Sequence, residues 1–217
     1  MIDFAQQRQN MVASQVLPNR VGEPRLVRAL GELPREIFVP APLKGVAYVD
    51  EDIALGGGRY VIEPLVLARL LQAADAASGD TVLDVGCTTG YGAALMARLA
   101  RKVVALESDG GLAEQARANL AQVGLANAEV VVGPLAEGYP AQAPYQVILI
   151  EGAVEEVPPA LMDQIAEQGR LVAVIERRGV GKGMLYRRDR GVVASLELFD
   201  AAVPVLPGMA AAPRFAF

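Results

Sequence analysis

The residues best suited to chemistry in this chain gather in one stretch, Val82–Tyr91, which reads Val-Leu-Asp-Val-Gly-Cys-Thr-Thr-Gly-Tyr. An apolar strand there is expected to pass through Gly86 and Gly90 into a helix. Glycines let the backbone come close to a ligand, and open α/β sheets bind ligands at the carboxyl ends of their strands. The turn that holds these glycines together with Cys87 and Thr88 is therefore a candidate binding loop.

A second candidate, Glu107, follows Asp84 by 23 positions and ends the next apolar strand, directly after Leu106. A carboxylate at the tip of a second strand, about 20 residues from a glycine turn, is placed to accept hydrogen bonds from a ribose diol. Asp84 adds negative charge, which would repel a pyrophosphate and attract an ammonium group. The pattern therefore favours a nucleoside cofactor that carries a cationic sulfonium, S-adenosylmethionine.

Other interpretations of the same turn stay open. Gly86 and Gly90 can simply make a tight strand-to-helix turn that Asp84 caps. A nicotinamide site is a second competitor, but it prefers the spacing G-x-G-x-x-G, whereas the glycines here are spaced G-x-x-x-G. Cys87 is interpreted as a small loop residue, because nothing nearby in the sequence would activate its thiol as a nucleophile.

Alternating strands and helices are expected to position this turn. Short apolar strands separated by helices predict an α/β fold with a largely parallel sheet covered on both faces. The expected strands are Thr81–Val85, Lys102–Glu107, Ala128–Val132, Tyr145–Ile150 and Gly169–Glu176. The expected helices between them are Gly92–Ala100, Gly111–Val123 and Pro159–Ala166. Two closely spaced strands, Gly183–Arg188 and Val192–Phe199, predict an antiparallel hairpin near the C-terminus.

The chain is expected to divide into residues 1–78, a helical and substrate-loop segment, and residues 79–217, a cofactor-binding domain, within one compact unit. Proline and glycine punctuate the first part. Its expected elements are a helical stretch Phe4–Leu33 with a second helix opening at Pro24, a short extended piece Pro34–Pro40, a flexible or tight turn Gly56–Gly58 and a helix from Pro64 to about Ala74.

Composition excludes several classes of function. Of 217 residues, 53% are apolar and 21% charged, which is typical of a globular protein, and the net charge of −5 argues against a general nucleic-acid binder. A local basic group is interpreted as a solvated hairpin rim rather than a nucleic-acid patch; its members are Arg177, Arg178, Lys182, Arg187, Arg188 and Arg190.

The rare residue types narrow the chemistry further. Without histidine the chain has no imidazole base and lacks the commonest zinc ligand, so a hydrolase triad or a metal site is not expected. A single cysteine excludes an intramolecular disulfide framework and indicates a reducing compartment. With no signal peptide or membrane-spanning stretch in the sequence, we expect a cytoplasmic protein without a membrane partner.

Taken together with these residues, several motifs make the chain resemble the protein-L-isoaspartate O-methyltransferase family from Met11 to about Pro207. The motifs are Leu33–Pro40, Ala47–Asp50, Val82–Tyr91, Ala143–Tyr145, Val157–Pro158 and Gly169–Val172. The N-terminal ones are specific, because other methyltransferases of this fold lack them. The resemblance implies a Rossmann-like, class I methyltransferase fold, S-adenosylmethionine as donor, and the carboxylate of isoaspartyl residues in damaged proteins as acceptor.

Around the acceptor site implied by the resemblance, the chain departs from the family pattern. The family carries Thr-Ile-Ser-x-Pro before a helix, and its serine hydroxyl is expected to touch the reacting carboxylate. This chain reads Tyr60-Val61-Ile62-Glu63-Pro64, so Ile62 stands at the serine position and cannot donate a hydrogen bond. The Tyr60 hydroxyl, two residues earlier in an extended loop, can replace that donor, or Tyr60 can be a packed rim aromatic.

Two further positions differ from the family. Glu151 replaces a threonine after the fourth strand, and Pro134 and Leu135 replace the end of a Gly-Asp-Gly piece expected beside the adenine. Glu63 and Glu151 would place negative charge near an anionic substrate, and like charges about 4 Å apart cost on the order of 1 kcal/mol in water. Three hypotheses follow: an isoaspartyl methyltransferase, a methyltransferase for another small acceptor that Glu151 orients or deprotonates, and a non-catalytic S-adenosylmethionine-binding protein. The oligomeric state stays open.

Overall fold

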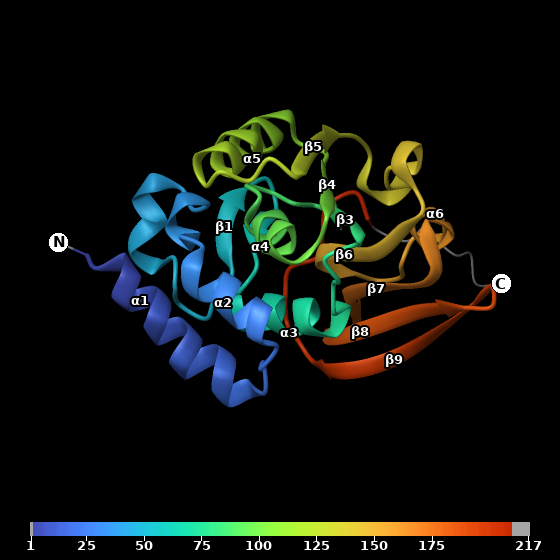
Figure 1. The fold of residues 1–217 in the computed structure, drawn as a ribbon, viewed down its shortest axis with the longest axis horizontal. Coiled ribbons are helices and arrows are strands. Elements are labelled where there is room, and N and C mark those ends of the chain that lie inside the picture. Colours follow the sequence, from blue (N-terminus) through green and yellow to red (C-terminus); the bar gives the residue numbers. More distant parts are fainter. Residues whose placement is uncertain (1, 210–217) are drawn as a thin grey trace.

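The centre of the molecule is a seven-stranded mixed sheet, seen in the computed structural model, which describes residues 2–209 (Figure 1). Its strands are β3 Thr81–Val85, β4 Lys102–Glu107, β5 Ala128–Val132, β6 Tyr145–Val154, β7 Ile165–Arg177, β8 Val180–Asp189 and β9 Val192–Asp200. They lie in the order β5-β4-β3-β6-β7-β8-β9, parallel up to β7 and antiparallel beyond it. The predicted α/β fold with its C-terminal hairpin is confirmed. Residues 210–217, the end of the expected cofactor domain, lie outside the described part.

Both faces of the sheet are buried, as the apolar strands predict. Successive residues of β6 enter opposite cores, with Val147 and Leu149 on one side and Ile148 and Ile150 on the other. The helices are α1 Phe4–Met11, α2 Pro24–Glu32, α3 Pro64–Ala74, α4 Tyr91–Leu99, α5 Gly110–Gln122 and α6 Pro159–Asp163. Helices α1 to α5 supply buried residues to the first core and α6 to the second.

The strand order places a switch point between β3 and β6. The chain leaves β3 on one side to form β4 and β5, and then returns to pair β6 with the other side of β3. At such a point the loops after the two neighbouring strands diverge, which opens room for a ligand at the carboxyl ends. The predicted turn after Val85 and the expected site residue Glu151 both lie at this edge.

Local sequence signals explain where the helices begin and end. Pro24 and Pro64 open α2 and α3 at the first helical position, as predicted. The helix expected over Pro159–Ala166 was too long, since α6 ends at Asp163. The chain must leave the helix there because Ile165 already pairs with the first residue of β6.

The extended piece expected over Pro34–Pro40 was wrong, because Arg35–Ile37 forms a 3-10 turn. The backbone N–H of Phe38 donates to the Arg35 carbonyl at 2.9 Å. This turn buries the Arg35 side chain, whose Nε donates to the Ala47 carbonyl at 2.7 Å. The bonds that Arg35 makes inside the protein therefore outweigh the extended preference that the two prolines impart.

A small hairpin precedes α3 and was not expected from the sequence. Its strands, β1 Ile53–Gly56 and β2 Arg59–Val61, pair antiparallel. The turn between them is the triple glycine, whose φ angles of +92°, +58° and +74° at Gly56, Gly57 and Gly58 favour residues without a Cβ. The predicted tight turn is thus present, and β2 brings the Arg59 side chain to the carboxyl edge of the sheet, where it bonds Glu107.

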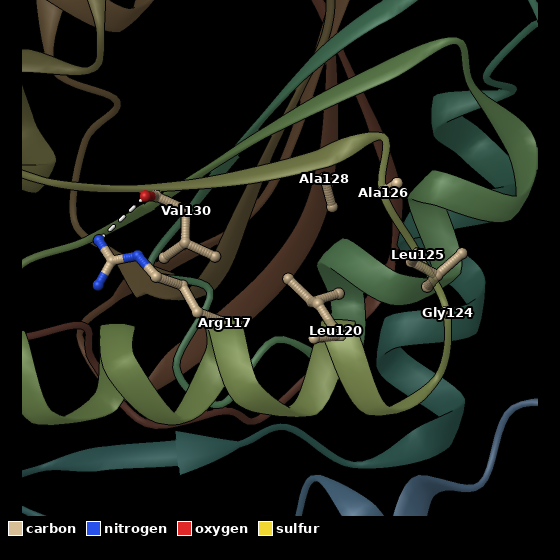
Figure 2. Close-up of a pocket in the computed structure, with 8 residues that line it drawn as sticks. Arg117, Leu120, Gly124, Leu125, Ala126, Ala128 and Val130 are labelled. Atoms are coloured by element: carbon tan, nitrogen blue, oxygen red, sulfur yellow. Dashed lines mark hydrogen bonds between the residues drawn. The ribbon is translucent and has the colours of Figure 1, made fainter.

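An apolar cavity of about 380 Å³ lies between the end of α5 and β5, far from that edge (Figure 2). Leu120, Leu125 and Val130 line it, and Arg117 closes one end by donating from Nη2 to the Val130 carbonyl at 3.0 Å. Ala128, the first residue of β5, also lines it, so the cavity opens near the amino end of the strand. Within residues 2–209 no helix has the length and apolar character needed to cross a bilayer.

Candidate functional site

The turn after β3 has the backbone shape that its glycines predict. Gly86 and Gly90 have φ angles of +80° and +94°, and a Cβ on Gly90 would lie 3.3 Å from the Ala116 side chain. The N–H groups of Gly86 and Cys87 both donate to the Leu106 carbonyl, at 2.8 and 3.2 Å, and fasten the turn to β4. Three of the predicted site residues are thereby brought together at the tips of β3 and β4.

Thr88 takes up an unusual conformation in the middle of this turn. Its φ is +50°, a left-handed value that β-branched residues rarely adopt. The side chain is buried, and its Oγ1 has no hydrogen-bond partner within the described residues. Backbone strain of this kind concentrates at functional turns, where surrounding contacts hold it in place.

Glu107 is the most completely bonded acid of the site. Its side chain is fully buried, and Oε2 accepts from Arg59 Nη2 at 2.6 Å and from the Thr88 N–H at 2.9 Å. Oε1 accepts from the backbone N–H groups of Ser108 and Asp109 at 2.8 and 3.0 Å. Both oxygens therefore already have donors that suit an ionised carboxylate.

Asp84 and Glu151 form a second, contrasting pair of acids at the ends of β3 and β6. Both are buried, and within residues 2–209 no group outside the pair donates a hydrogen bond to either oxygen of Asp84 or to Oε1 of Glu151. Burial raises the pKa of Asp84 to about 7, with the Glu107 charge adding to the effect, although the hydrogen bond to Glu151 opposes it. Burial and the neighbouring Asp84 raise the pKa of Glu151 well above its usual value. The two carboxyl groups therefore share a proton near neutral pH.

Arg35 supports the site from beneath. It is fully buried, donates from Nη2 to the Ile62 carbonyl at 2.8 Å, and stacks with its guanidinium carbon 4.8 Å from the centre of the Tyr91 ring. Burial lowers the pKa of its guanidinium, while the charge of Glu151 opposes that shift. Arg35 lies in the motif Leu33–Pro40, but the sequence predicted no role for it; an arginine within a largely apolar stretch bracketed by prolines was the available signal.

The segment Pro204–Leu206 lies across the same edge, which the sequence did not predict. The Ala153 N–H donates to the Pro204 carbonyl at 2.9 Å, and the Leu206 N–H donates to the Ala153 carbonyl at 2.8 Å. The two methyl groups of Leu206 lie 3.0 and 3.1 Å from the point where a Cβ of Gly86 would be. The loop glycine thus makes room for the chain's own C-terminal segment.

Comparison with known families shows which family this chain belongs to. The model of the protein-L-isoaspartate(D-aspartate) O-methyltransferase (PCMT) family matches residues 6–201, most of the chain. The chain belongs to the PCMT family. The predicted family is therefore confirmed, and with it the class of enzyme, a methyltransferase family that uses S-adenosylmethionine.

Individual relatives agree with the family match. A protein-L-isoaspartate O-methyltransferase of Methanoregula boonei is 39% identical over 183 residues, 84% of each chain. One from Koribacter versatilis is 36% identical over 211 residues, 97% of this chain and 95% of its own. The PCMT assignment thus extends over both the N-terminal helices and the sheet.

Solved structures of PCMT proteins share the fold. A protein-L-isoaspartate O-methyltransferase superposes with a TM-score of 0.81 at 24% identity, covering 94% of this chain and 67% of that one. A Plasmodium falciparum protein described as a member of the same family superposes with a TM-score of 0.77 at 17% identity, covering 96% and 100%. That second structure is a complex with S-adenosyl-L-homocysteine. The predicted class I methyltransferase fold is confirmed.

The remaining predicted site residues differ in their surroundings. Ile62 is buried in the core and contributes its carbonyl to Arg35, while Tyr60, on β2, is half-buried and its hydroxyl has no hydrogen bond within the described residues. Pro134 is exposed, whereas Leu135 packs into the second core. Burial raises the pKa of the Cys87 thiol, which fits a packed loop residue rather than a nucleophile.

The charge expected at Glu63 and Glu151 needs correction. Burial and the acids Asp50 and Asp52 raise the pKa of Glu63 to about 7, so this side chain is partly neutral at neutral pH. Glu151 holds or shares a proton for the reason given above. The repulsion of an anionic substrate that two full negative charges would cause is therefore weaker than the sequence indicates.

S-adenosylmethionine fits the residue types of this edge. Three buried oxygens of Asp84 and Glu151 have no donor from outside the pair in the described residues, and the ammonium group of the amino-acid part would supply one. Glu107 stands at the strand tip that suits a ribose, but Arg59 and three backbone N–H groups occupy its oxygens. The acids predicted to hold the donor thus lie together at this edge, and Arg59 already bonds one of them, Glu107.

Proposed function

We propose that this chain transfers a methyl group to the free carboxylate of isoaspartyl residues in proteins or peptides, with S-adenosylmethionine as donor. The match to the PCMT family over residues 6–201 carries the proposal. The acids Asp84, Glu107 and Glu151 at the carboxyl edge of the sheet support it, because they present acceptors to a cationic, ribose-containing ligand. When bound, the donor supplies an electrophilic methyl group on its sulfonium.

The chain's residues have to hold and align the reactants rather than activate them. An isoaspartyl carboxylate is ionised at neutral pH and needs no base, which suits a protein without histidine. Alignment and exclusion of water supply most of the rate of such a displacement. We assign the acceptor-binding hydrogen bond to the Tyr60 hydroxyl, which is free to donate and precedes the buried Ile62 by two residues.

Arg35 acts as a positioning residue for this loop. Its two hydrogen bonds to the Ala47 and Ile62 carbonyls, at 2.7 and 2.8 Å, join the 3-10 turn to the end of β2. Because these bonds are buried, they fix the backbone that carries Tyr60. The Tyr60 hydroxyl, the proposed hydrogen-bond donor to the methyl acceptor, thus lies on a rigid segment.

A different acceptor is the second candidate. The Ile62 side chain offers no hydrogen-bond donor to a methyl acceptor. In residues 2–209 no group outside the Asp84–Glu151 pair donates a hydrogen bond to Oε1 of Glu151. An amine or hydroxyl acceptor would find an orienting carboxyl there. A non-catalytic protein that binds S-adenosylmethionine is the third candidate. The ion pair that Glu107 already makes with Arg59 favours it.

The proposed partners follow from the same chemistry. We expect isoaspartyl proteins as substrates and no nucleic acid, because cations of the basic hairpin are engaged locally. Lys182 pairs with Glu197 at 2.8 Å, and Arg188 Nη2 donates to the Met162 carbonyl at 2.8 Å. The cytoplasmic location and the division at residue 78 stay predictions.

Radioactive methyl transfer to an isoaspartyl peptide tests the function. We expect base-labile label on the isoaspartyl peptide and none on the same sequence with normal aspartate. Tyr60→Phe should lower kcat/KM for that peptide about tenfold, the scale of one hydrogen bond to a charged group. Tyr186→Phe, on β8, should leave it unchanged. Label on amines or hydroxyls instead would favour the second candidate, and no label with donor bound would favour the third.

A further inference from the structure

Arg59 is a buried cation placed against the acid that should receive the donor ribose. Its side chain is 6% exposed and that of Glu107 is 0% exposed, with 2.6 Å between Nη2 and Oε2. Nη1 also donates to Ser108 Oγ at 3.4 Å. A ribose hydroxyl can bond Glu107 only by displacing a donor or by sharing an oxygen that already accepts at least two bonds.

The guanidinium also fills the space above the cofactor turn. Arg59 Nη2 lies 3.3 Å from the point where a Cβ of Gly86 would be. Its positive charge opposes the rise in the pKa of Glu151 that burial causes, so it acts on the acidic pair as well. Arg59 therefore already pairs with the acid expected to bond the donor ribose, and it adds positive charge beside the acids expected to bond the donor's ammonium group.

Leu206 closes the edge from the other side. It is 4% exposed and contacts the Cβ positions of both Gly86 and Gly152, at 3.0 and 3.1 Å. Two backbone hydrogen bonds with Ala153 hold its segment in line with β6. Pro207 reaches the hairpin turn, where its Cγ lies 3.1 Å from the Cβ position of Gly58. The segment thus bridges the tips of β3 and β6 and the turn that leads into Arg59.

We propose that Arg59 and Leu206 hold the donor site closed, and that S-adenosylmethionine binds only when both side chains move away from Gly86 and Glu107. The proposal rests on the donor named under the proposed function. Arg59 is then the residue that sets donor affinity, because apparent affinity falls in proportion to the fraction of molecules that are open. Removing either closing side chain raises that fraction.

Calorimetric titration with S-adenosyl-L-homocysteine tests this without any turnover. We expect Arg59→Gln to bind at least tenfold more tightly than the wild-type chain, and Leu206→Ala at least threefold. Arg8→Gln is the matched control, since Arg8 pairs with Glu36 at 3.3 Å in the N-terminal segment and its loss changes the net charge equally. Circular dichroism establishes that each variant is folded. If Arg59→Gln does not fold, Leu206→Ala alone decides, since it leaves no charge unpaired.

The outcomes are distinct. Equal affinity in wild type and variants overturns the closed state, and weaker binding by Arg59→Gln does so too, by making Arg59 a ligand contact. No binding by any folded variant overturns both this proposal and the proposed function. If the variants bind more tightly and neither they nor the wild-type chain methylate the isoaspartyl peptide, the closed state is supported and the proposed function is refuted.

Hydrogen exchange provides a second measurement on the wild-type protein. The Ala153 and Leu206 amides are bonded only while the segment lies in place. Saturating S-adenosyl-L-homocysteine should therefore speed exchange at these two amides, whereas ligands ordinarily slow it. Slower exchange at both would show that the segment stays in place over the ligand and would overturn its displacement.

Discussion

The Asp84 and Glu151 carboxyl groups are hydrogen-bonded at the switch point of the sheet, where burial favours their sharing a proton. Asp84 lies on β3 and pairs with Leu149 of β6, two residues before Glu151. The negative charge of Glu107 raises the pKa of Asp84. The positive charges of Arg35 and Arg59 oppose the rise in the pKa of Glu151. The pair is therefore a source of pH-dependent stability in the absence of ligand.

Stability should fall as pH rises from about 4 to about 8. The pKa of Asp84 is raised to about 7 in the folded chain, so the folded state binds more protons than the unfolded state in this window. The stabilisation is present at low pH and is lost as pH rises through about 7. Glu63, with a pKa also raised to about 7, acts in the same direction.

Glu151→Gln isolates the contribution of the pair. The amide can donate a hydrogen bond to ionised Asp84, so we expect the variant to be more stable than wild type at pH 8 by about 2 kcal/mol and nearly equal at pH 5. Urea unfolding at both pH values measures this. A parallel shift of both curves would contradict the shared proton, and Glu155→Gln, exposed beyond β6, is the control.

Arg35 should be irreplaceable by lysine. Its planar group serves two buried carbonyls and the Tyr91 ring at once, which a single ammonium cannot do. We expect Arg35→Lys to lower the free energy of unfolding by about 2 kcal/mol, because one buried carbonyl loses its donor. Arg98→Lys, on an exposed position of α4, should change it by less than about 0.5 kcal/mol in the same urea titration.

Much of the fold followed from local patterns. The strands at Thr81–Val85, Lys102–Glu107 and Ala128–Val132 were predicted to the residue, because short apolar runs end at glycine or acidic turns there. Pro24 and Pro64 fixed two helix starts because their missing N–H groups are harmless at the first helical position. These signals act between neighbouring residues, which is why one sequence sufficed.

The contacts that decide access to the site were beyond such patterns. Arg59 and Glu107 are 48 positions apart, and periodicity says nothing of which buried acid a distant arginine meets. The segment Pro204–Leu206 is held by hydrogen bonds to the Ala153 backbone. Every residue type except proline can make such bonds, so the side chains of this segment do not predict them. The two short strands around the triple glycine were too brief to show an alternating pattern.

Thr88 offers a test of strain at the cofactor turn. A left-handed φ of +50° and a buried Oγ1 without a partner in the described residues both disfavour threonine. Thr88→Gly should raise the free energy of unfolding by about 1 kcal/mol, since relief of strain exceeds the entropy that glycine adds to the unfolded chain. Thermal unfolding of the two proteins compares them. A destabilised variant would mean that the threonine methyl contributes more packing than its conformation costs.

Gly92 tests whether the buried Glu151 carboxyl lies where the structure has it. Gly92 is the second residue of α4, and a Cβ there would overlap the Glu151 carboxylate. Gly92→Ala should therefore destabilise the protein by about 2 kcal/mol, the scale of overpacking in a core. The control is Gly31→Ala in α2, where a Cβ meets no atom within 4 Å and helix propensity alone should stabilise by about 0.5–1 kcal/mol. Opposite signs for the two variants in urea unfolding confirm the close approach of Glu151 to α4. A stabilised Gly92→Ala would place that carboxyl elsewhere, and the shared proton with Asp84 would have to be abandoned with it.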